Sequence, residues 1–394
     1  MKLQAQSARV LSSALGNSLK CIASKNAVAI LDYVLLSKHD DGVLYFTSAT
    51  SDSQLTVPAP FTIVDGKFEK PVALPAKDIT QFLSTLPDCT ITFDFVDDKI
   101  LSLEYCTTVG DKTKTGKVSL TYIQGNEFPM MVSPSDGGCH ISLPGSVFVG
   151  VVDKVKNFAA IDELRPVMGA MCIDVSEDMS EVVFVATDGH VLYKRVHSND
   201  SSKGGSDFFR GGTPSKILLH KQYFRTLSVF SSAEQIDIES DGHVIRVTSG
   251  DIEFICKALD GRYPNYNSVI PRNNPYHVCF DKSEMLAVIK RVAIFSSESD
   301  NLVELRKDGL FLTVSAEDID FGQSADDQVL ITDAECPDGF RIGFKASSLI
   351  DVISSVGADS IRLTLADPSR PGVVTADEPS PRVLALVMPM ILNN

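Results

Sequence analysis

One short stretch of the sequence combines residue types that could perform acid–base chemistry. Residues 186–192 read Ala-Thr-Asp-Gly-His-Val-Leu, so an aspartate stands two positions before a histidine. In a hydrolase, His190 would act as the general base and Asp188 would orient its ring. However, two side chains of one tight turn cannot pair and also leave room for a nucleophile, and the sequence holds no G-x-S-x-G elbow. The pattern predicts a turn whose histidine is satisfied by backbone groups, in a protein that is not an enzyme.

Motifs that bind nucleotides or metal ions are also missing. The sequence contains no G-x-x-x-x-G-K-[ST] loop and no Gly-rich dinucleotide fingerprint. The pairs Asp97-Asp98 and Asp326-Asp327 are typical of solvated turns rather than of metal ligands. The eight cysteines are scattered singly, which favours reduced thiols of a cytosolic protein over a zinc site or a disulfide framework. We therefore expect no cofactor and no metal.

The net charge of the chain is strongly negative. Its 36 Lys and Arg residues against 51 Asp and Glu residues give −15 over 394 residues. Taken as an average, this charge argues against a polyanion such as DNA as a partner. The N-terminus lacks an apolar signal region, and no stretch approaches the ~18 apolar residues of a membrane span. A soluble cytoplasmic protein without membrane contact is expected.

The elements that must position these residues repeat three times. In each third of the chain, an apolar segment with helical spacing precedes strands in which apolar residues alternate. The three helical segments align at Leu86, Phe230 and Val356. The alternating strand residues are Ile91, Phe93 and Phe95; Ile236, Ile238, Val244, Ile245 and Val247; and Ile361, Leu363 and Leu365.

A second helix is predicted earlier in each third, over residues 7–16, 146–160 and 282–295. In the last of these segments, apolar residues recur at mixed three and four spacing, and Ser283 is the predicted N-cap. Two helices followed by short strands in each third indicate an α+β unit. In such a unit, helices cover one face of an antiparallel sheet.

Two aromatic-proline pairs mark the boundaries between the thirds. Phe128-Pro129 and Tyr263-Pro264 each follow a glycine-containing turn. Because proline forces the residue before it into an extended conformation, extended connectors are expected there. The predicted domains are residues 1–132, 133–264 and 265–394, and residues 198–212 are predicted to form a long flexible loop in the second domain.

Four motifs carry a resemblance to a known family. They are the stretch 186–192, Leu164-Arg165-Pro166-Val167-Met168-Gly169, Asp260-Gly261-Arg262-Tyr263-Pro264-Asn265-Tyr266 and Val387-Met388-Pro389-Met390. In their order and spacing along the chain they resemble the bacterial sliding clamps, the β subunits of DNA polymerase III, and the resemblance covers all three repeats. It implies three repeated clamp domains, each an antiparallel β-sheet with two α-helices. It also implies a head-to-tail homodimer that closes as a ring around duplex DNA.

The resemblance implies a function as well. Sliding clamps have no catalytic activity; they tether polymerases topologically, which makes DNA replication processive. The implied partners are double-stranded DNA bound without sequence preference, a second copy of the chain, the DNA polymerase III α subunit, the clamp loader, and other DNA polymerases and repair proteins with clamp-binding peptides. ATP consumption belongs to the loading partner.

The family's partner pocket takes short linear peptides and lies between the second and third domains. Methionine and aliphatic residues make an adaptable apolar slot for a Leu or Phe anchor, and backbone near Gly189 and Pro389 can pair an extended peptide. Taken alone, residues 388–390 are more typical of a C-terminal edge strand that proline ends. The resemblance places the pocket walls at Arg165, Met168, Thr187, Gly189, His190, Val191, Leu192, Pro264, Ser268, Val269, Leu386, Met388, Pro389 and Met390.

The distribution of charge favours DNA more than its average does. The six predicted helical segments together carry +7, so the rest of the chain carries −22. In the implied ring, basic helices would line the central hole and acidic sheets would face outward. This arrangement suits weak, sequence-independent contact with DNA, which permits sliding. The resemblance places Lys25 in a basic loop that approaches the duplex. The residues of the predicted helical segments expected to face DNA are Lys154, Lys156, Lys221, Arg225 and Lys290.

An alternative from a different class remains. The chain could be a scaffold of repeated α+β domains that does not bind DNA, and its acidic charge would then aid solubility. The positive charge of the predicted helices favours the clamp.

Overall fold

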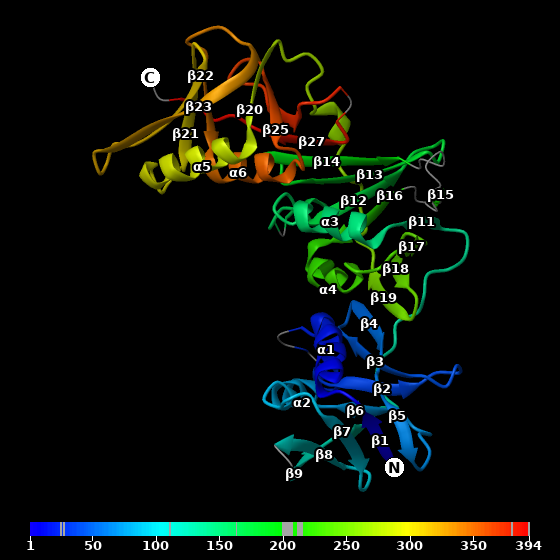
Figure 1. Ribbon diagram of the computed structural model, residues 1–394. Coiled ribbons are helices and arrows are strands. Elements are labelled where there is room, and N and C mark those ends of the chain that lie inside the picture. The colour runs from blue at the N-terminus through cyan, green and yellow to red at the C-terminus, as the bar shows by residue number, and fades with distance from the viewer. Residues whose placement is uncertain are drawn as a thin grey trace. The chain divides into compact units, whose positions relative to one another are not determined.

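Antiparallel strands and a few short helices make up the described chain, as the predicted α+β class requires. The computed structural model describes residues 1–392 apart from 24, 25, 27, 110, 111, 163, 199–207, 211–215 and 380. Its elements group into two units (Figure 1). The first contains the described residues of 1–149, 208–210 and 222–258, and the second those of 150–198, 216–221 and 259–392.

The first unit holds a five-stranded and a ten-stranded sheet. Their strands are β1 (Lys2–Ala5), β2 (Val34–Lys38), β3 (Leu44–Ala49), β4 (Ser53–Pro58), β5 (Thr62–Asp65), β6 (Val72–Leu74), β7 (Thr90–Phe95), β8 (Ile100–Val109), β9 (Lys112–Thr121), β10 (Ile123–Gln124), β11 (Cys139–Leu143), β15 (Phe208–Arg210), β17 (Ile236–Ser240), β18 (Val244–Ser249) and β19 (Ile252–Lys257). The strand orders are β5-β1-β7-β8-β9 and β10-β6-β2-β3-β4-β19-β18-β17-β11-β15. Pairing of β4 with β19 therefore joins strands of the first predicted domain to strands of the second.

Helix α1 (Ala8–Ser18) shows how local sequence sets these elements. Ser7 is its N-cap, because its side chain accepts a hydrogen bond from the Val10 N–H. Leu11 and Leu15, four residues apart, have no exposed surface, and the helix packs against β3, β4 and α2 (Ala76–Leu83). In β7, apolar residues alternate with polar ones as predicted, and the apolar side chains are buried.

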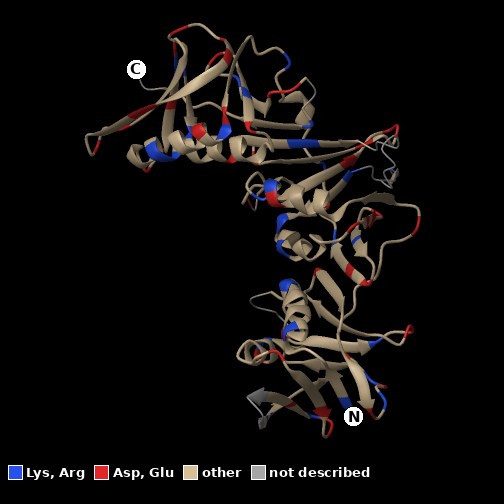
Figure 2. Cartoon of the chain, in the orientation of Figure 1, with Lys and Arg blue, Asp and Glu red and all other residues tan. Residues whose placement is uncertain are grey.

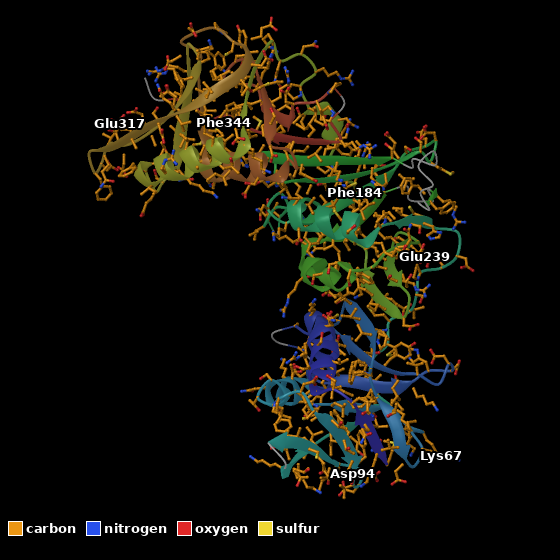
Figure 3. All side chains as sticks on the ribbon, in the orientation of Figure 1. Lys67, Asp94, Phe184, Glu239, Glu317 and Phe344 are labelled. Atoms are coloured by element: carbon orange, nitrogen blue, oxygen red, sulfur yellow. The ribbon has the colours of Figure 1, made fainter. Side chains whose placement is uncertain are left out.

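The second unit is built on one twelve-stranded sheet. Its strands are β12 (Ala170–Val175), β13 (Glu181–Thr187), β14 (Val191–Ser198), β16 (Lys216–His220), β20 (Tyr276–Asp281), β21 (Leu302–Asp308), β22 (Phe311–Asp318), β23 (Gln323–Glu335), β24 (Arg341–Lys345), β25 (Ser360–Leu365), β26 (Gly372–Ala376) and β27 (Val383–Val387). Their order is β16-β12-β13-β14-β27-β26-β25-β20-β23-β22-β21-β24. Phe184 on β13 and Phe344 on β24, both fully buried, belong to its core (Figure 3).

Helices α5 (Lys282–Val292) and α6 (Ala346–Ser355) pack against each other and cover strands of this sheet. The predicted N-cap of α5 was wrong. Asp281 is the cap, because its backbone is extended and its carboxylate accepts the Glu284 N–H at 2.8 Å. Ser283 lies inside the first turn, where its hydroxyl donates to Asp281 at 2.6 Å.

Two helices are shorter in the structure than the sequence pattern predicts. Helix α3 (Gly145–Val155) ends five residues before the predicted position 160, although the Phe158 and Ala159 N–H groups still donate to the Val155 carbonyl. The segment 223–230 contains only one α-helical turn, α4 (Phe224–Leu227). It is flanked by the 3-10 turns η5 (Lys221–Tyr223) and η6 (Ser228–Phe230).

The predicted loop over residues 198–212 contains a short strand. Residues 208–210 form β15, which pairs with β11, so Phe209 is buried opposite Ile141. The other residues of the predicted loop, apart from Ser198 at the end of β14, lie outside the described part of the chain.

The eight cysteines, all of them in the described part of the chain, form no disulfide with one another, and five of them are buried. Burial raises the pKa of the Cys21 thiol to about 11 and that of Cys172 to about 12. Among the described residues, none of the helices has both the length and the apolar character needed to cross a bilayer.

Candidate functional site

The turn between β13 and β14 is built by its own side chains. Thr187 Oγ1 accepts the Gly189 N–H at 3.1 Å and donates to the Val191 carbonyl at 2.7 Å. Asp188 Oδ1 accepts the N–H groups of His190 and Val191 at 2.7 and 2.8 Å. Gly189 has φ +96°, a conformation that favours glycine. The Asp188 carboxylate thus organises the backbone, and His190 is exposed.

Two further predicted residues lie against this turn. A Cβ built on Gly189 would lie 3.7 Å from Met168 Cε and 3.8 Å from Arg165 Nη1, so both side chains reach the glycine. Met168 is buried and closes a 3-10 turn (η3, Pro166–Gly169), because its N–H donates to the Arg165 carbonyl at 3.0 Å. Arg165 is exposed, and its guanidinium holds the pKa of the Asp162 carboxyl below its usual value.

Strand β27 brings the C-terminal residues to the same turn. Residues 383–387 pair with residues 191–195 of β14. Beyond the strand, the Met388 N–H donates to the His190 carbonyl at 2.8 Å. Because β27 also pairs with β26, it is an internal strand of the sheet and not the edge strand that residues 388–390 indicate when taken alone. Pro389, which has no N–H, lies beyond the ladder and interrupts no strand pairing.

The chain continues from β27 to the edge strand β24. The Met390 N–H donates to the Gly343 carbonyl at 2.8 Å and forms an isolated antiparallel bridge. Backbone hydrogen bonds therefore fix Met388 and Met390 on either side of Pro389. The Met388 side chain remains 36% exposed, while Pro389 and Met390 are half-buried. This segment can offer apolar surface to a ligand while its backbone stays fixed.

The connector between β19 and β20 carries three more predicted residues. Pro264, Ser268 and Val269 are all exposed, and 53% of the Val269 side chain is accessible. The Ser268 hydroxyl donates to the Asn265 carbonyl at 2.7 Å and closes the short 3-10 turn η7 (Tyr266–Ser268).

Tyr266 fastens this connector to the sheet. Its hydroxyl donates to Asp174 Oδ2 at 2.9 Å. The ammonium groups of Lys194 and Lys216 lie 5.5 and 5.4 Å from its ring centroid, within the range of cation–π attraction. Burial, together with the nearby Asp174 carboxylate, raises the pKa of Tyr266. The ring shares one apolar cluster with Leu192 and Leu386, so the connector joins β14 and β27 in a common core.

The structure brings all four predicted segments of the pocket into one region of the second unit. The residues of these segments divide into a buried and an exposed group. The buried members are Met168, Thr187, Val191, Leu192 and Leu386. The exposed or half-buried members are Arg165, Gly189, His190, Pro264, Ser268, Val269, Met388, Pro389 and Met390. Val191 and Leu192 are only 3% and 1% exposed, so they belong to the core beneath the site and offer a ligand almost no surface.

The predicted DNA-facing lysines of the second unit are not equally free. Lys154 Nζ donates to the Ser354 carbonyl at 3.1 Å, near the end of α6, and Lys221 Nζ donates to the Ala159 carbonyl at 3.3 Å. Lys156 lies 4.0 Å from Asp153 in a weak exposed pair. Lys290 is exposed in the last turn of α5. Figure 2 shows Lys and Arg residues of the chain in blue, including those on this helix.

In the first unit, Arg225 lies close to a second cation. Burial and the positive charge of Arg225 both lower the pKa of Lys20, and the Thr226 hydroxyl donates to the Lys20 carbonyl at 3.1 Å. Sequence reasoning counted Lys20 in the charge of the first helix but did not single it out. Lys25, the other predicted residue here, lies outside the described part of the chain.

One group of side chains among the described residues has the types of a metal site. Ligand atoms of His277, Cys279 and Asp333 lie within 4.8 Å of one another. However, the Arg362 guanidinium lies 3.4 Å from Asp333 and 2.9 Å from Asp377. Because a cation of the chain itself already compensates these carboxylates, we assign no metal to this group.

Sequence reasoning also missed Tyr266 and Gly343 as supports of the site. Tyr266 stands at the end of the quoted stretch 260–266, so its position was visible. The role of Gly343 could not be predicted, because no pattern in the sequence indicates that the middle of β24 lies beside residues 388–392.

Comparison with known proteins identifies the family. Residues 142–265 match the central domain of the DNA polymerase III β subunit, and residues 267–391 match its C-terminal domain. The β sliding clamp of Caulobacter vibrioides is 26% identical over 396 residues, covering 99% of this chain and 100% of that protein. The clamp of Pseudomonas aeruginosa is 25% identical over 82% of each chain.

Solved structures agree with the fold. The P. aeruginosa sliding clamp bound to griselimycin superposes with a TM-score of 0.85 at 21% identity, over 100% of both chains. The β subunit of Streptococcus pyogenes DNA polymerase superposes with a TM-score of 0.85 at 17% identity, also over 100% of both chains. The two matched domains contain all residues of the candidate site, and the structural matches cover the whole chain. The chain therefore belongs to the family of DNA polymerase III β subunits, the β sliding clamps.

Proposed function

We propose that two copies of this chain join head to tail into a ring that encircles duplex DNA. The ring tethers the replicative polymerase and other partners, makes DNA replication processive and performs no catalysis itself. The observation that carries this proposal is the site at the β14–β27 junction, where the turn 187–192, Met168 and Met388 meet.

The site suits an extended peptide with an apolar anchor. Val269, Met388 and Met390 offer accessible apolar surface, and thioethers adapt to anchors of different shape. The exposed backbone at Gly189 can approach a peptide closely, since it carries no side chain. The proposed peptide partners are the DNA polymerase III α subunit, the clamp loader, other DNA polymerases and repair proteins.

DNA contact rests on the charge of the helices. Lys156 and Lys290 in the second unit, and Arg225 with Lys20 in the first, are basic residues on or next to helices. Few such residues are available, so only few phosphates would be neutralised at a time. Weak contact of this kind permits movement along DNA.

Ring closure requires two complementary surfaces, and two free strand edges fit this need. Strand β9 is the outer strand of its sheet and carries the exposed Lys114. In the described part of the chain, residues 323–330 of β23 pair with β22 only, while residues 331–335 pair with β20. Asp326 on this free edge is exposed. Pairing of the two edges between copies would join opposite charges.

The same proposal retains the three clamp domains over residues 1–132, 133–264 and 265–394. The two family matches, over residues 142–265 and 267–391, correspond to the second and third of them to within one residue at the boundary. Because the proposed function acts on DNA during replication, we expect the protein to work in the cytoplasm.

Loading of the protein onto circular and onto linear DNA tests the proposal. A ring should stay on closed circular DNA and slide off the ends of the same DNA after linearisation. Retention is measured by gel filtration of labelled protein after loading. Equal loss from both templates contradicts the topological mechanism, whereas a mass of one subunit in solution contradicts ring closure.

A further inference from the structure

The two most exposed large apolar side chains of the described chain stand beside the proposed peptide site. Ile161 is 95% exposed and Leu164 is 92% exposed. Both precede Arg165, whose guanidinium reaches Gly189 in the turn of that site. Single exposed apolar residues are ordinary on protein surfaces, but two this exposed at the margin of a binding site indicate an interaction surface.

Groups next to these two side chains are hydrogen-bonded within the chain. Asp162 Oδ1 accepts the Leu164 N–H at 2.9 Å, and Asp162 Oδ2 accepts Arg165 Nε at 2.8 Å. On the other side, the Ala160 N–H donates to the Met168 carbonyl at 2.8 Å. The chain is therefore hydrogen-bonded at Ala160, next to Ile161, and at Leu164 and Arg165.

A depression of about 540 Å³ opens at Ile161 and continues from the peptide site. Arg165 and Asp188, which belong to the peptide site or its turn, are among its lining residues, as are Lys156 and Lys221. All of these residues belong to the second unit. A segment that leaves the peptide site past Arg165 would enter this depression.

The acidic groups of the depression already have donors within the chain. Asp162 accepts from Leu164 and Arg165, and Asp188 accepts two backbone N–H groups of its own turn. Asp351 accepts Asn157 Nδ2 at 2.8 Å, and burial raises its pKa. None of the three carboxylates therefore needs a cation from a ligand.

The two lysines retain donor capacity. An ammonium group has three donors, and Lys221 Nζ uses one on the Ala159 carbonyl. Lys156 Nζ has Asp153 at 4.0 Å and is exposed. The chemistry left for a ligand in this depression is thus hydrogen bonding and charge pairing with a carboxylate.

We propose that this depression and its rim bind the part of a partner peptide that flanks the apolar anchor. An aliphatic side chain of that flank covers Ile161 and Leu164, and an acidic side chain pairs with Lys156 and Lys221. The inference rests on the proposed function, because the anchor must occupy the adjoining site. It adds a preference for flanks that are both aliphatic and acidic.

Fluorescence anisotropy with the full chain tests this preference. The probes are a labelled six-residue peptide that ends in Leu-Phe, the same core with Leu-Asp-Glu added at either end, and matching versions with Leu-Lys-Lys. The acidic extension at one end should tighten binding roughly three- to tenfold, the sum of one exposed charge pair and partial burial of one aliphatic side chain. The lysine version should bring no gain.

Variants test whether Ile161, Leu164 and Lys156 cause the gain in affinity from the acidic extension. The double variant Ile161→Ser/Leu164→Ser should bind the core peptide like the wild type and should lose most of the gain from the extension. Val132→Ser, at an equally apolar and 80% exposed position of the first unit, serves as the matched control. Lys156→Glu should reverse the preference, so that the lysine extension binds more tightly than the acidic one.

The outcomes separate this inference from the proposed function. If the core peptide binds but neither extension adds affinity, the inference is wrong and the peptide site stands. If the core peptide does not bind, the peptide site itself is wrong, and the inference fails with it. If Ile161→Ser/Leu164→Ser weakens binding of a single-stranded oligonucleotide but leaves the affinity gained from the acidic extension unchanged, this surface binds DNA and the inference is overturned.

Discussion

Gly343 and Met390 form the contact that fixes the C-terminal segment on the edge of β24. The Met390 N–H donates to the Gly343 carbonyl at 2.8 Å. A Cβ on Gly343 would lie 2.7 Å from Leu392 Cδ2, 2.9 Å from Leu302 Cδ1 and 3.0 Å from the Met390 carbonyl oxygen. These separations are too short for a methyl group, so a residue outside the predicted site controls how closely the segment approaches the sheet.

Substitution Gly343→Ala should therefore displace residues 388–392 and weaken peptide binding. Overpacking of this kind costs roughly 1–3 kcal/mol. If about half of that cost falls on the bound state, binding weakens roughly two- to tenfold. Calorimetric titration with the Leu-Phe core peptide measures the effect. The double variant Gly343→Ala/Leu392→Ala should recover part of the affinity, because the nearest clash involves Leu392. Unchanged affinity in the single variant would show that the bridge does not position Met388 and Met390.

Removal of residues 388–394 should abolish peptide binding and leave the fold intact. Strand β27 ends at Val387, so its pairing with β14 and β26 survives the truncation. The expected result is no measurable heat of peptide binding, with a thermal midpoint within a few degrees of the wild type. A shorter truncation of residues 393–394 is the control. Wild-type affinity after the longer truncation would contradict the assignment of Met388 and Met390 to the site.

Charge reversal on the helices should slow loading onto DNA. Lys156→Glu and Arg225→Glu each replace an exposed cation, and loading should fall severalfold at low salt and less at high salt. Lys154→Glu should also lower stability, since Lys154 Nζ donates to the Ser354 carbonyl. Lys67→Glu, at an exposed position of the first unit, is the matched control (Figure 3). A loss of loading that does not change with salt would show that these residues act in another way.

A charge swap tests the proposed pairing of β9 with β23. Either Lys114→Glu or Asp326→Lys alone should place like charges opposite each other and shift the dimer toward monomers. The two substitutions together should restore the dimer. Analytical ultracentrifugation over a dilution series reports the change in dimer affinity, for which a factor of about 3–10 is expected from one pair. Additive weakening in the double variant would place the interface elsewhere.

Stability should fall at alkaline pH because of buried thiols. Burial raises the pKa of Cys172 from 9.0 to about 12. Below pH 9 the thiol is protonated in the folded and unfolded states, so stability does not depend on its titration. Between pH 9 and 12 only the unfolded thiol ionises, and stability is lost as pH rises. At pH 10 the loss is about 1.4 kcal/mol for one such thiol. Thermal unfolding of the wild type and of Cys172→Ala at pH 8 and 10 measures it; an equal pH dependence in both proteins would contradict the assignment.

Local patterns predicted the helices and strands that local chemistry sets. The alternation at Ile91, Phe93 and Phe95 was confirmed, because period-two burial fixes which face of a strand meets the core. The N-cap of α5 was wrong because Asp281 and Ser283 are both good capping residues. Only the extended backbone at Asp281 decides between them.

Long-range pairing is the part that the sequence could not predict. Pairing of β14 with β27 joins residues nearly two hundred positions apart, and no local pattern encodes that register. The same pairing decides which predicted site residues are accessible. Val191 belongs to the quoted motif, yet β27 covers it and leaves it 3% exposed. Motif matches selected the segments of the proposed site, whereas the contacts between these segments determine which of its residues are exposed.

The internal position of β27 has a mechanical consequence. In the proposed function, a partner bound at Met388 would pull on β27 along the strand axis, since Met388 directly follows the last residue of the strand. Neighbouring strands bond to β27 on both sides, so such a pull loads several hydrogen bonds at once, in shear. An edge strand peeled from its end would break its bonds one after another. The anchoring strand is therefore suited to bear tension.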